Sequence, residues 1–397
     1  MTTSMSVTSD PALRRAVERV ASPLGDPELL TARLAWSALA EPGDSVSGRL
    51  VAECGPVAAL RLVEDLAAGV PTPEIPGVTP QELTTSLRRW QPRLDARMFE
   101  SLAVAAVKAG LAVLTPEGPL WPERFEDLGE HAPLALWVRG EPAALGGLDR
   151  SAALVGARAA TPYGEHVAAT LAGELAEQGV GIVSGGAYGV DGAAHRAALG
   201  VKGTTVAFVA GGADRVYPAA HAHLFARIAD GGAVVAEVPP GGTPTKWRFL
   251  MRNRLIAAVS AATVVVEAGW RSGSLNTAGH AAALGRPLGA VPGPVTSATS
   301  EGCHRLLREF DATCITRASD VLELIGEWGV GDDRTGGDRP RPEAIRVLDA
   351  LAVRAWRTLD DIARRSGMSL AEVQAELGLL ELDGRIESSL DGWRLHR

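Results

Sequence analysis

Between Leu134 and about residue 326, short runs of β-forming apolar residues alternate with helical stretches, and this alternation limits the possible folds more than any other feature of the sequence. The runs are ALVGAR, GIVSG, TVAFVAGG, AVVAEV, TVVVEAG and PLGAVPGP, and segments such as PYGEHVAATLAGELAEQG separate them. Strands that are almost continuously apolar and alternate with helices are typical of a parallel sheet covered on both faces. The sequence therefore predicts an α/β domain with a doubly wound, mainly parallel sheet.

From Leu29 to about Leu114, apolar residues recur every three or four positions, with Pro and Gly between the groups. This spacing predicts short packed helices. We expect a small helical domain over residues 26–115, after a flexible N-terminus of residues 1–25. The stretch PGDSVSGRLVAECGPVAAL suggests a SAM-like or helix-hairpin-helix arrangement, although helical hairpins without such a function are common.

A stretch rich in Gly, Asp, Arg and Pro predicts a flexible linker over residues 327–342. Residues 343–397 then show the pattern of three helices, with Thr358 and Ser369 as N-caps, and of a hairpin around Asp391 and Gly392. This order is typical of a winged-helix domain. The segment Ser369–Asp383 lacks Lys and Arg and carries four acids, which favours protein contact or dimer control over DNA reading: Glu372, Glu376, Glu381 and Asp383.

The charge balance sets limits on the partners. With 39 Lys plus Arg against 47 Asp plus Glu, the formal net charge is -8, so any site for a polyanion has to be a local patch. Three scattered cysteines indicate neither a disulfide framework nor a metal knuckle. The sequence shows no export signal and no membrane span, and we expect a cytoplasmic protein.

The segment KWRFLMRNR is such a local patch, with four cations and no acid in nine residues: Lys246, Arg248, Arg252 and Arg254. On a helix, positions 248 and 252 share a face, and Arg suits bidentate contact with phosphate. The alternative is a solvated helix face that pairs with acids of the protein. No acid lies between Arg248 and Ser260, which counts against local pairing.

Gly- and Ser-rich loops follow several of the predicted strands, where ligands bind in doubly wound sheets. Backbone N–H groups at the start of a helix attract anions, so these loops predict phosphate binding, although glycines at such turns can also serve tight geometry alone. The candidate residues are Ser184, Gly185, Gly186 and Gly189 in one loop, and Arg271, Ser272, Gly273, Ser274 and Thr277 in another.

Motifs for other chemistries are missing. The first turn lacks G-x-G-x-x-G, and the second strand ends in VSGG without the acid that would hold a ribose, so we expect no NAD or FAD. A Walker motif and a nucleophile elbow are also missing. His195 fits a structural position in a helix, and His221 and His223 fit a helix surface better than a metal site. We therefore predict no catalytic residue, no metal and no cofactor.

Four long stretches resemble the DprA (Smf) family of DNA-processing proteins. They are ALVGARAATPYGEHVAATLAGELAEQGVGIVSGGAYGVDGAAHRAAL, TVAFVAGGADRVYPAAHAHLFARI, MRNRLIAAVSAATVVVEAGWRSGSLNTAGHAAALGRPLGAVPGP and SEGCHRLLREFDA. The resemblance implies an extended Rossmann-like domain over residues 116–326. It also implies a non-enzymatic protein of bacterial transformation that binds single-stranded DNA as a dimer and helps to load the recombinase RecA.

The same resemblance assigns the DNA site. The Gly-Ser-Arg turn of the family corresponds to Gly156, Ala157 and Arg158, its basic helix signature to Arg252, Asn253 and Arg254, and phosphates would lie on the amides of SGG and RSGS. The chain departs from the family pattern at three places: Ala157 replaces Ser, Tyr188 stands where Arg is expected, and Met251 replaces a cation. These departures predict weaker or less salt-dependent DNA binding.

Three functions stay open on the sequence alone. The leading one is sequence-independent binding of single-stranded DNA, with bases stacked on Tyr188, Trp247 or Phe249. The second is a nucleotide phosphoribohydrolase of the LOG (lysine-decarboxylase-like) type. The glutamate of that family's P-G-G-x-G-T-x-x-E loop is missing, however, and Glu267 precedes the corresponding loop instead. The third is an adaptor whose DNA site has decayed.

Overall fold

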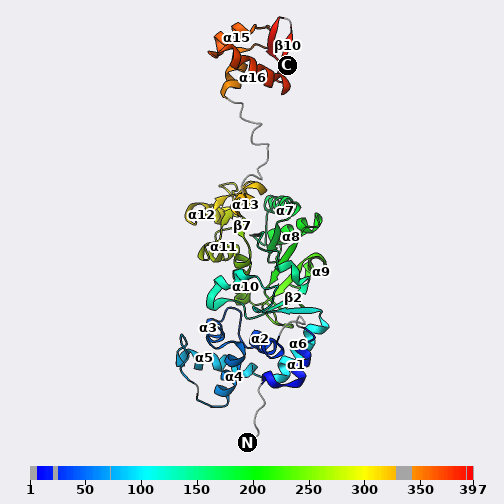
Figure 1. Ribbon diagram of the computed structural model, residues 1–397, viewed down its shortest axis with the longest axis vertical. Helices are drawn as coiled ribbons and strands as arrows, with labels where there is room; N and C mark the ends of the chain where they lie inside the picture. The colour runs from blue at the N-terminus through cyan, green and yellow to red at the C-terminus, as the bar shows by residue number, and fades with distance from the viewer. Residues whose placement is uncertain (1–6, 21–25, 72, 328–341, 390, 397) are drawn as a thin grey trace. The chain divides into compact units, whose positions relative to one another are not determined.

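The computed structural model of the protein describes residues 7–20, 26–71, 73–327, 342–389 and 391–396. The chain forms two compact units, Met1–Val330 and Gly331–Arg397 (Figure 1). Residues 328–341, which make up most of the predicted linker, lie outside the described residues. None of the helices in the described part of the chain combines the length and the apolar character that a membrane span requires.

The first unit begins with short helices whose first turns carry Asp N-caps or Pro. The segment that we predicted to be flexible includes two short helices, η1 and α1, and Leu13 and Val17 of α1 are buried in the core of this part. The helices are η1 Val7–Ser9, α1 Pro11–Val17, α2 Pro27–Leu39, α3 Ser45–Cys54, α4 Pro56–Ala67, α5 Pro80–Trp90, η2 Gln91–Arg93 and α6 Ala96–Lys108.

A nine-stranded sheet follows, in the order β1-β2-β6-β5-β4-β3-β7-β8-β9. Strand β2 runs antiparallel to its neighbours β1 and β6, and the other pairs are parallel. The strands are β1 Leu111–Leu114, β2 Leu136–Gly140, β3 Ser151–Gly156, β4 Gly181–Ser184, β5 Thr205–Val209, β6 Ala233–Ala236, β7 Ala262–Glu267, β8 Leu288–Ala290 and β9 Thr313–Cys314.

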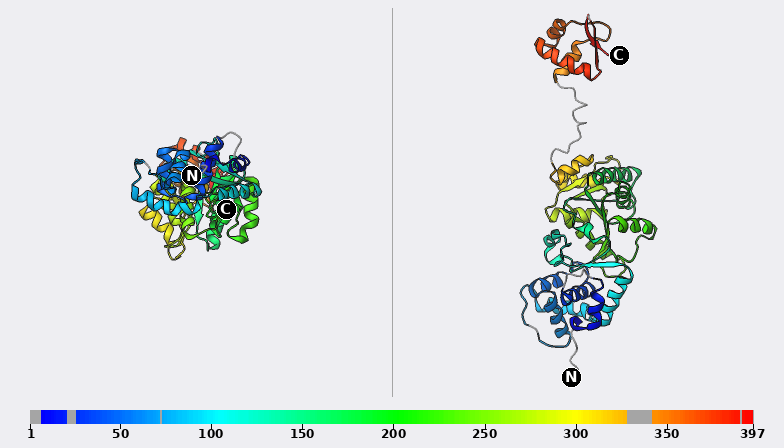
Figure 2. Two further views of the ribbon diagram at one scale, coloured as in Figure 1. Left: turned by 90° about the horizontal axis from the view of Figure 1, so that it is seen from below. Right: turned by 45° about the vertical axis from the view of Figure 1, so that its right-hand side comes forward.

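Helices cover both faces of this sheet (Figures 1 and 2). Ala152 and Leu154 point into the core beneath one set of helices, and Ala153 and Val155 into the core beneath the other. This alternation confirms the predicted doubly wound, mainly parallel α/β fold. The helices are α7 Pro162–Glu177, α8 Val190–Gly200, α9 Ala222–Gly231, α10 Lys246–Val259, α11 Ser274–Ala283, α12 Glu301–Glu309 and α13 Ala318–Leu324, with the short η3 Glu123–His131, η4 Pro142–Leu145 and η5 Ala219–His221.

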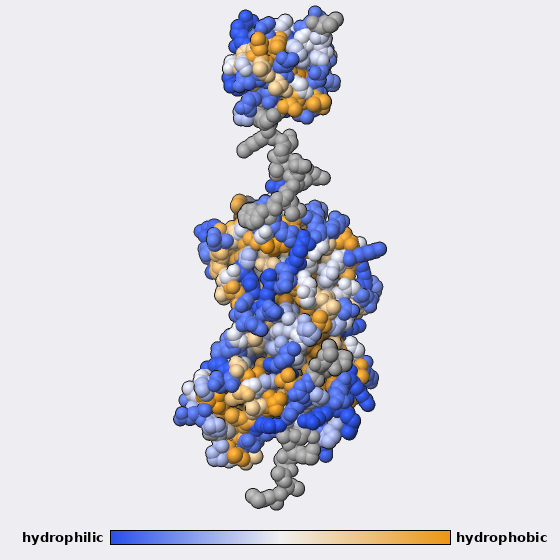
Figure 3. Space-filling model, in the orientation of Figure 1, coloured by the Kyte–Doolittle hydropathy of each residue, from blue (hydrophilic) through white to orange (hydrophobic). Residues whose placement is uncertain are grey.

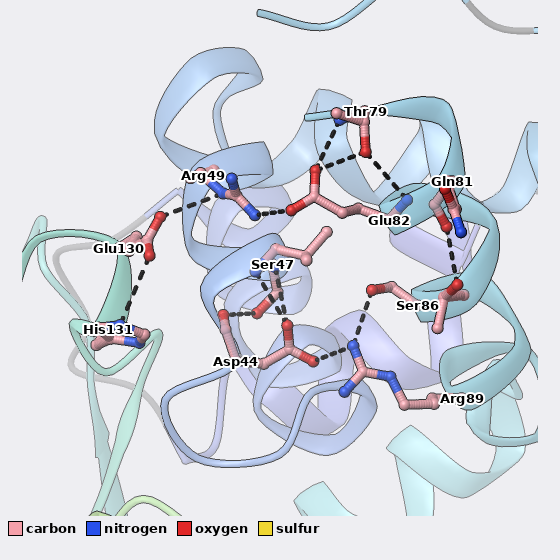
Figure 4. A network of polar contacts seen from close by, with 12 residues as sticks. Asp44, Ser47, Arg49, Thr79, Gln81, Glu82, Ser86, Arg89, Glu130 and His131 are labelled. Carbon is pink, nitrogen blue, oxygen red and sulfur yellow. Dashed lines mark hydrogen bonds and ion pairs between the residues drawn. The ribbon is translucent and has the colours of Figure 1, made fainter. Parts of the chain in front are cut away.

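The helical part and the sheet share one core, in which buried residues of α2 and α6 join Trp137, Phe225 and Val234. A network of polar contacts also connects the helical part to the part that contains the sheet (Figure 4). Arg49 on α3 pairs with Glu82 at 2.8 Å and with Glu130 of η3 at 3.2 Å. The first unit is therefore held together across the boundary between its helices and its sheet.

The second unit has three helices and a two-stranded hairpin: α14 Pro342–Ala350, α15 Leu359–Ser366, α16 Leu370–Leu382, β10 Ile386–Ser389 and β11 Gly392–Leu395. Thr358 caps α15 and Ser369 caps α16, which confirms both predicted N-caps. Val347, Ile362 and Leu377 lie in its core. The arrangement is that of a winged-helix domain.

The surface of the winged-helix domain carries hydrophobic patches between hydrophilic ones (Figure 3). On α16, Leu370, Leu379 and Leu382 are exposed together with acidic side chains. A helix of this composition is unsuited to a DNA groove. Protein contact by this domain stays a prediction.

Candidate nucleic-acid interface

The strand order of the sheet reverses between β3 and β7, and the loops that follow these two strands flank a pocket of about 800 Å³. Such a switch point is where doubly wound sheets bind ligands. Residues of α10 and α11 and of the segments that follow β4 and β5 complete the pocket. Many of the predicted site residues line it: Gly156, Ala157, Arg158, Lys246, Phe249, Arg252, Asn253, Arg271, Ser272, Gly273 and Ser274.

Three cations in this lining are exposed and form no ion pair with any described residue: Arg158, Lys246 and Arg271. The Arg158 guanidinium lies 4.6 Å from the centre of the Phe249 ring, in a cation–π contact that orients it without neutralising its charge. Unpaired cations around one pocket give it a positive potential in a protein that is acidic overall. We call Arg158, Lys246 and Arg271 the free cations.

The first turn of α11 adds hydrogen-bonding groups to the pocket. Its N-cap Gly273 has no side chain that could cap the helix, and the hydroxyls of Ser272 and Ser274 lie 2.8 Å apart beside it. The Ser272, Leu275 and Asn276 N–H groups of this turn donate to the carbonyls of Gly269, Ser272 and Gly273 at 3.0, 3.2 and 3.2 Å, and the Ser274 N–H contacts the Ser272 hydroxyl at 3.4 Å. Ser272 and Ser274 line the pocket, and phosphate binding on the RSGS amides stays a prediction.

The turn after β3 differs from the expectation in one respect. The Ala157 N–H donates to the Glu267 carbonyl at 2.7 Å, so it is already used within the protein. Gly156 is needed because a Cβ there would lie 2.5 Å from Val190 Cγ2. This turn thus offers the pocket the Arg158 guanidinium and not the Ala157 amide.

The SGG turn after β4 is also used internally, contrary to the expectation that it would hold phosphate. The N–H groups of Gly185 and Ala187 donate to Asp191 Oδ2 at 3.2 and 3.3 Å. Ser184 donates its hydroxyl to a backbone carbonyl, and the Gly186 carbonyl contacts His221 Nδ1 at 3.0 Å. Burial raises the pKa of Asp191, and the nearby Arg252 opposes that rise.

Arg252 lines the pocket but is almost fully buried, and it braces this same turn. Its guanidinium donates to the carbonyls of Gly185, at 2.8 Å, and Phe208. Burial lowers the pKa of Arg252 to about 10. Asn253 beside it donates to Asn276 Oδ1 at 3.1 Å and so connects α10 to α11. These two residues position the pocket walls.

Arg248 and Arg254, which we predicted to contact DNA, are each paired with an acid of the protein. Arg248 donates twice to Glu41 at 3.0 Å, and Arg254 donates to Glu237 at 2.7 Å. Arg254 is buried, and its Nε also donates to the His131 carbonyl. Of the four cations in the basic segment, all of them described, only Lys246 lines the pocket and is both exposed and free of an ion pair, because Arg252 in the same lining is buried on backbone carbonyls.

The aromatic residues near the site are only partly those that the sequence suggested. Phe249 lines the pocket, but Tyr188 and Trp247 do not, although both are exposed. Tyr188 instead contacts the His221 ring edge-to-face at 4.8 Å. Two exposed aromatics that the sequence reasoning missed, Tyr217 and Trp270, line the pocket.

The histidines have structural roles in the fold. His195 is buried, its Nδ1 lies 2.7 Å from the Thr205 hydroxyl, and burial lowers its pKa to about 3. His221 is buried as well, whereas we expected it on a helix surface, because its ring nitrogen meets the Gly186 carbonyl. Neither imidazole lines the pocket.

Glu267, the acid that matters for the hydrolase alternative, is buried outside this pocket. Its carboxylate accepts hydrogen bonds from the Thr161 N–H at 2.8 Å and from the hydroxyls of Thr161 and Thr299 at 2.8 and 2.7 Å. It thereby fixes the start of α7. Both of its oxygens are used in this structural role.

Comparison with known proteins gives matches over both units. The family model described as DNA recombination-mediator protein A matches residues 112–326, and the model described as DprA winged helix domain matches residues 336–392. A relative from Mycobacterium tuberculosis is 49% identical over 311 residues, which cover 73% of this chain and 78% of the relative. Protein Smf of Escherichia coli is 37% identical over 280 residues, covering 67% and 72% of the two chains.

The X-ray structure of DNA processing protein A from Streptococcus pneumoniae is similar with a TM-score of 0.60 at 29% identity, covering 74% of this chain and 96% of that one. This structural match agrees with the fold described above. The chain belongs to the DprA (Smf) family of DNA processing proteins.

Proposed function

We propose that the protein binds single-stranded DNA without sequence preference and breaks no bond in it. The observation that carries this proposal is the set of free cations around a pocket whose wall includes the Phe249 ring. Cations contact phosphates of any sequence, and an aromatic ring stacks on any unpaired base. The bases of a duplex are already stacked on one another, so the pocket suits a single strand better.

The partners that we propose are those that the resemblance of the sequence to the family implies. We propose that the protein acts as a homodimer in the cytoplasm and loads RecA recombinase on the strand that it holds, during DNA uptake and recombination. The exposed leucines and acids of α16 suit contact with another protein better than contact with DNA. The winged-helix domain is therefore our candidate for a protein-binding part of the chain.

The phosphoribohydrolase alternative has less support. Hydrolysis of a glycosidic bond needs a carboxylate that reaches the substrate. Glu267 lies outside the main pocket, and its buried carboxylate accepts hydrogen bonds from Thr161 and Thr299. Asp191 lines the pocket, but its carboxylate accepts hydrogen bonds from amides of the SGG turn. Both acids thus have structural partners.

A titration of labelled oligothymidylate with the purified protein, against unlabelled single-stranded and duplex competitors, tests the proposal. We expect the single strand to compete better than the duplex, and the affinity to fall as salt rises. The same preparation should release no base from nucleoside monophosphates. Turnover of a monophosphate, or equal competition by the duplex, would contradict the proposal.

A further inference from the structure

Trp270 stands out among the aromatic residues on the surface of the described chain. Its side chain is 54% exposed, yet it lines the main pocket between Gly269 and Arg271. Exposed indole loses the free energy that burial of its apolar surface would provide. A Trp at the edge of a cationic pocket is therefore suited to a ligand that covers it.

The Trp270 indole has a cation–π partner on the neighbouring helix α12, which favours one orientation of its ring. The Arg305 guanidinium lies 5.1 Å from the centre of the Trp270 ring, and Arg305 is itself paired with Glu309 at 2.8 Å on α12. The Gly302 N–H donates to the Ala268 carbonyl at 2.7 Å, so the start of α12 is tied to the same loop. A side chain ordered in advance loses little conformational entropy when it binds.

Trp270 belongs to a different wall of the pocket from Phe249. Trp270 is in the loop after β7, whereas Phe249 is on α10 and has Tyr217 at 5.7 Å and Arg158 at 4.6 Å. Each wall thus has an aromatic ring with an arginine on it. The two rings are therefore two separate stacking surfaces in one pocket.

We infer that Trp270 is a second base-stacking residue, which binds the unpaired base of a nucleotide adjacent to the one at Phe249. This inference rests on the proposed function and deepens it, because it makes the ligand a strand of at least two nucleotides and not a mononucleotide. Stacking on an indole does not depend on the identity of the base. The contact therefore adds affinity without adding sequence preference.

The test compares Trp270→Ala with Trp247→Ala, because Trp247 is exposed to nearly the same extent, 56%, but does not line the pocket. Oligothymidylates of about 4, 8 and 16 nucleotides serve as probes. We expect Trp270→Ala to weaken binding by about tenfold. Trp270→Phe should retain most of the affinity, Trp270→Leu should not, and Trp247→Ala should bind like the wild type.

Two further readouts separate stacking from other roles. Because Trp270 carries no charge, the dependence of log affinity on log salt should stay that of the wild type, whereas Arg271→Ala should flatten it. Thermal unfolding of Trp270→Ala should match the wild type, since the side chain is largely exposed.

The inference is overturned if Trp270→Ala or Trp270→Leu binds every oligonucleotide like the wild type, or if Trp247→Ala loses as much affinity. In both cases wild-type binding still supports the proposed function. If the wild type itself does not bind single strands, the proposed function fails and the inference fails with it.

Discussion

The first residue of α10 and the later cations of that helix differ in what surrounds them. Lys246 in the first turn is exposed on the pocket without an ion pair, whereas Arg252 and Arg254 are buried and bonded to carbonyls or acids of the protein. The difference shows that a basic segment can serve two purposes. One part offers charge to a ligand, and the other holds the walls of its pocket.

Removal of a buried cation should have the largest effect. Arg254→Ala leaves Glu237, whose side chain is only 11% exposed, without its cation. We expect the free energy of unfolding to fall by roughly 3–5 kcal/mol. Denaturant titration measures this loss, and Arg158→Ala, an exposed arginine in the same unit, is the matched control. Unchanged stability together with weaker DNA binding in Arg254→Ala would contradict the structural role of this buried arginine.

A buried histidine that lies outside the pocket should make the free energy of unfolding depend on pH. The unfolded chain protonates His195 below about pH 6.5, but the pKa of His195 in the folded protein is lowered to about 3. As the pH falls from 6.5 towards 3, the unfolded state binds more protons. This residue should then remove about 1.4 kcal/mol of stability per pH unit.

The variant His195→Asn keeps an N–H that can reach the Thr205 hydroxyl and has no charge to gain. Unfolding titrations at several pH values between about 4 and 7 should therefore show a shallower loss of stability for the variant than for the wild type. Equal slopes for the two proteins would show that the pKa of His195 is not lowered by folding, contrary to this prediction.

A free cation should affect DNA binding and leave stability alone. Because Arg158 has no acid partner among the described residues, Arg158→Ala should unfold like the wild type and weaken single-strand binding by about tenfold. Anisotropy titrations measure the affinity. If Arg158→Ala lost stability, Arg158 would have a structural role like that of the buried cations.

We expect the smallest effects for Lys246 and Arg248, which lie near each other on α10 but should differ in DNA binding. Lys246→Ala should weaken binding a few-fold and flatten its salt dependence, since Lys246 lines the pocket. Arg248→Ala should leave binding nearly unchanged and cost about 1 kcal/mol or less of stability, because its pair with Glu41 is partly exposed. If the two variants weaken binding equally, the pairing of Arg248 with Glu41 does not persist in the complex.

The sheet and the place of the pocket could be predicted from the sequence because both follow from local patterns. Apolar runs such as TVVVEAG predicted strands like β7, and the carboxyl ends of parallel strands bring their loops to one edge. That reasoning placed Arg158, Lys246 and Ser272 at one pocket although they are far apart in the chain.

The partners of the charged groups could not be predicted because they come from long-range packing. Arg248 meets Glu41, which is 207 residues away, so the lack of acids near Arg248 carried no information about its pairing. Asp191 is close in sequence to Gly185, but only the turn of the backbone shows that its carboxylate accepts the amides. Trp270 directly precedes the RSGS motif in the sequence, and its exposure on the pocket is visible only in the structure.

The function that we propose depends on the binding of single-strand phosphates by the free cations. Its most direct test is the dependence of log affinity on log salt for the wild type and for the triple variant Arg158→Ala, Lys246→Ala, Arg271→Ala. We predict that the triple variant folds like the wild type and that its slope is smaller by about 2, because each cation lost neutralises one phosphate fewer. An unchanged slope in a folded triple variant would contradict the claim.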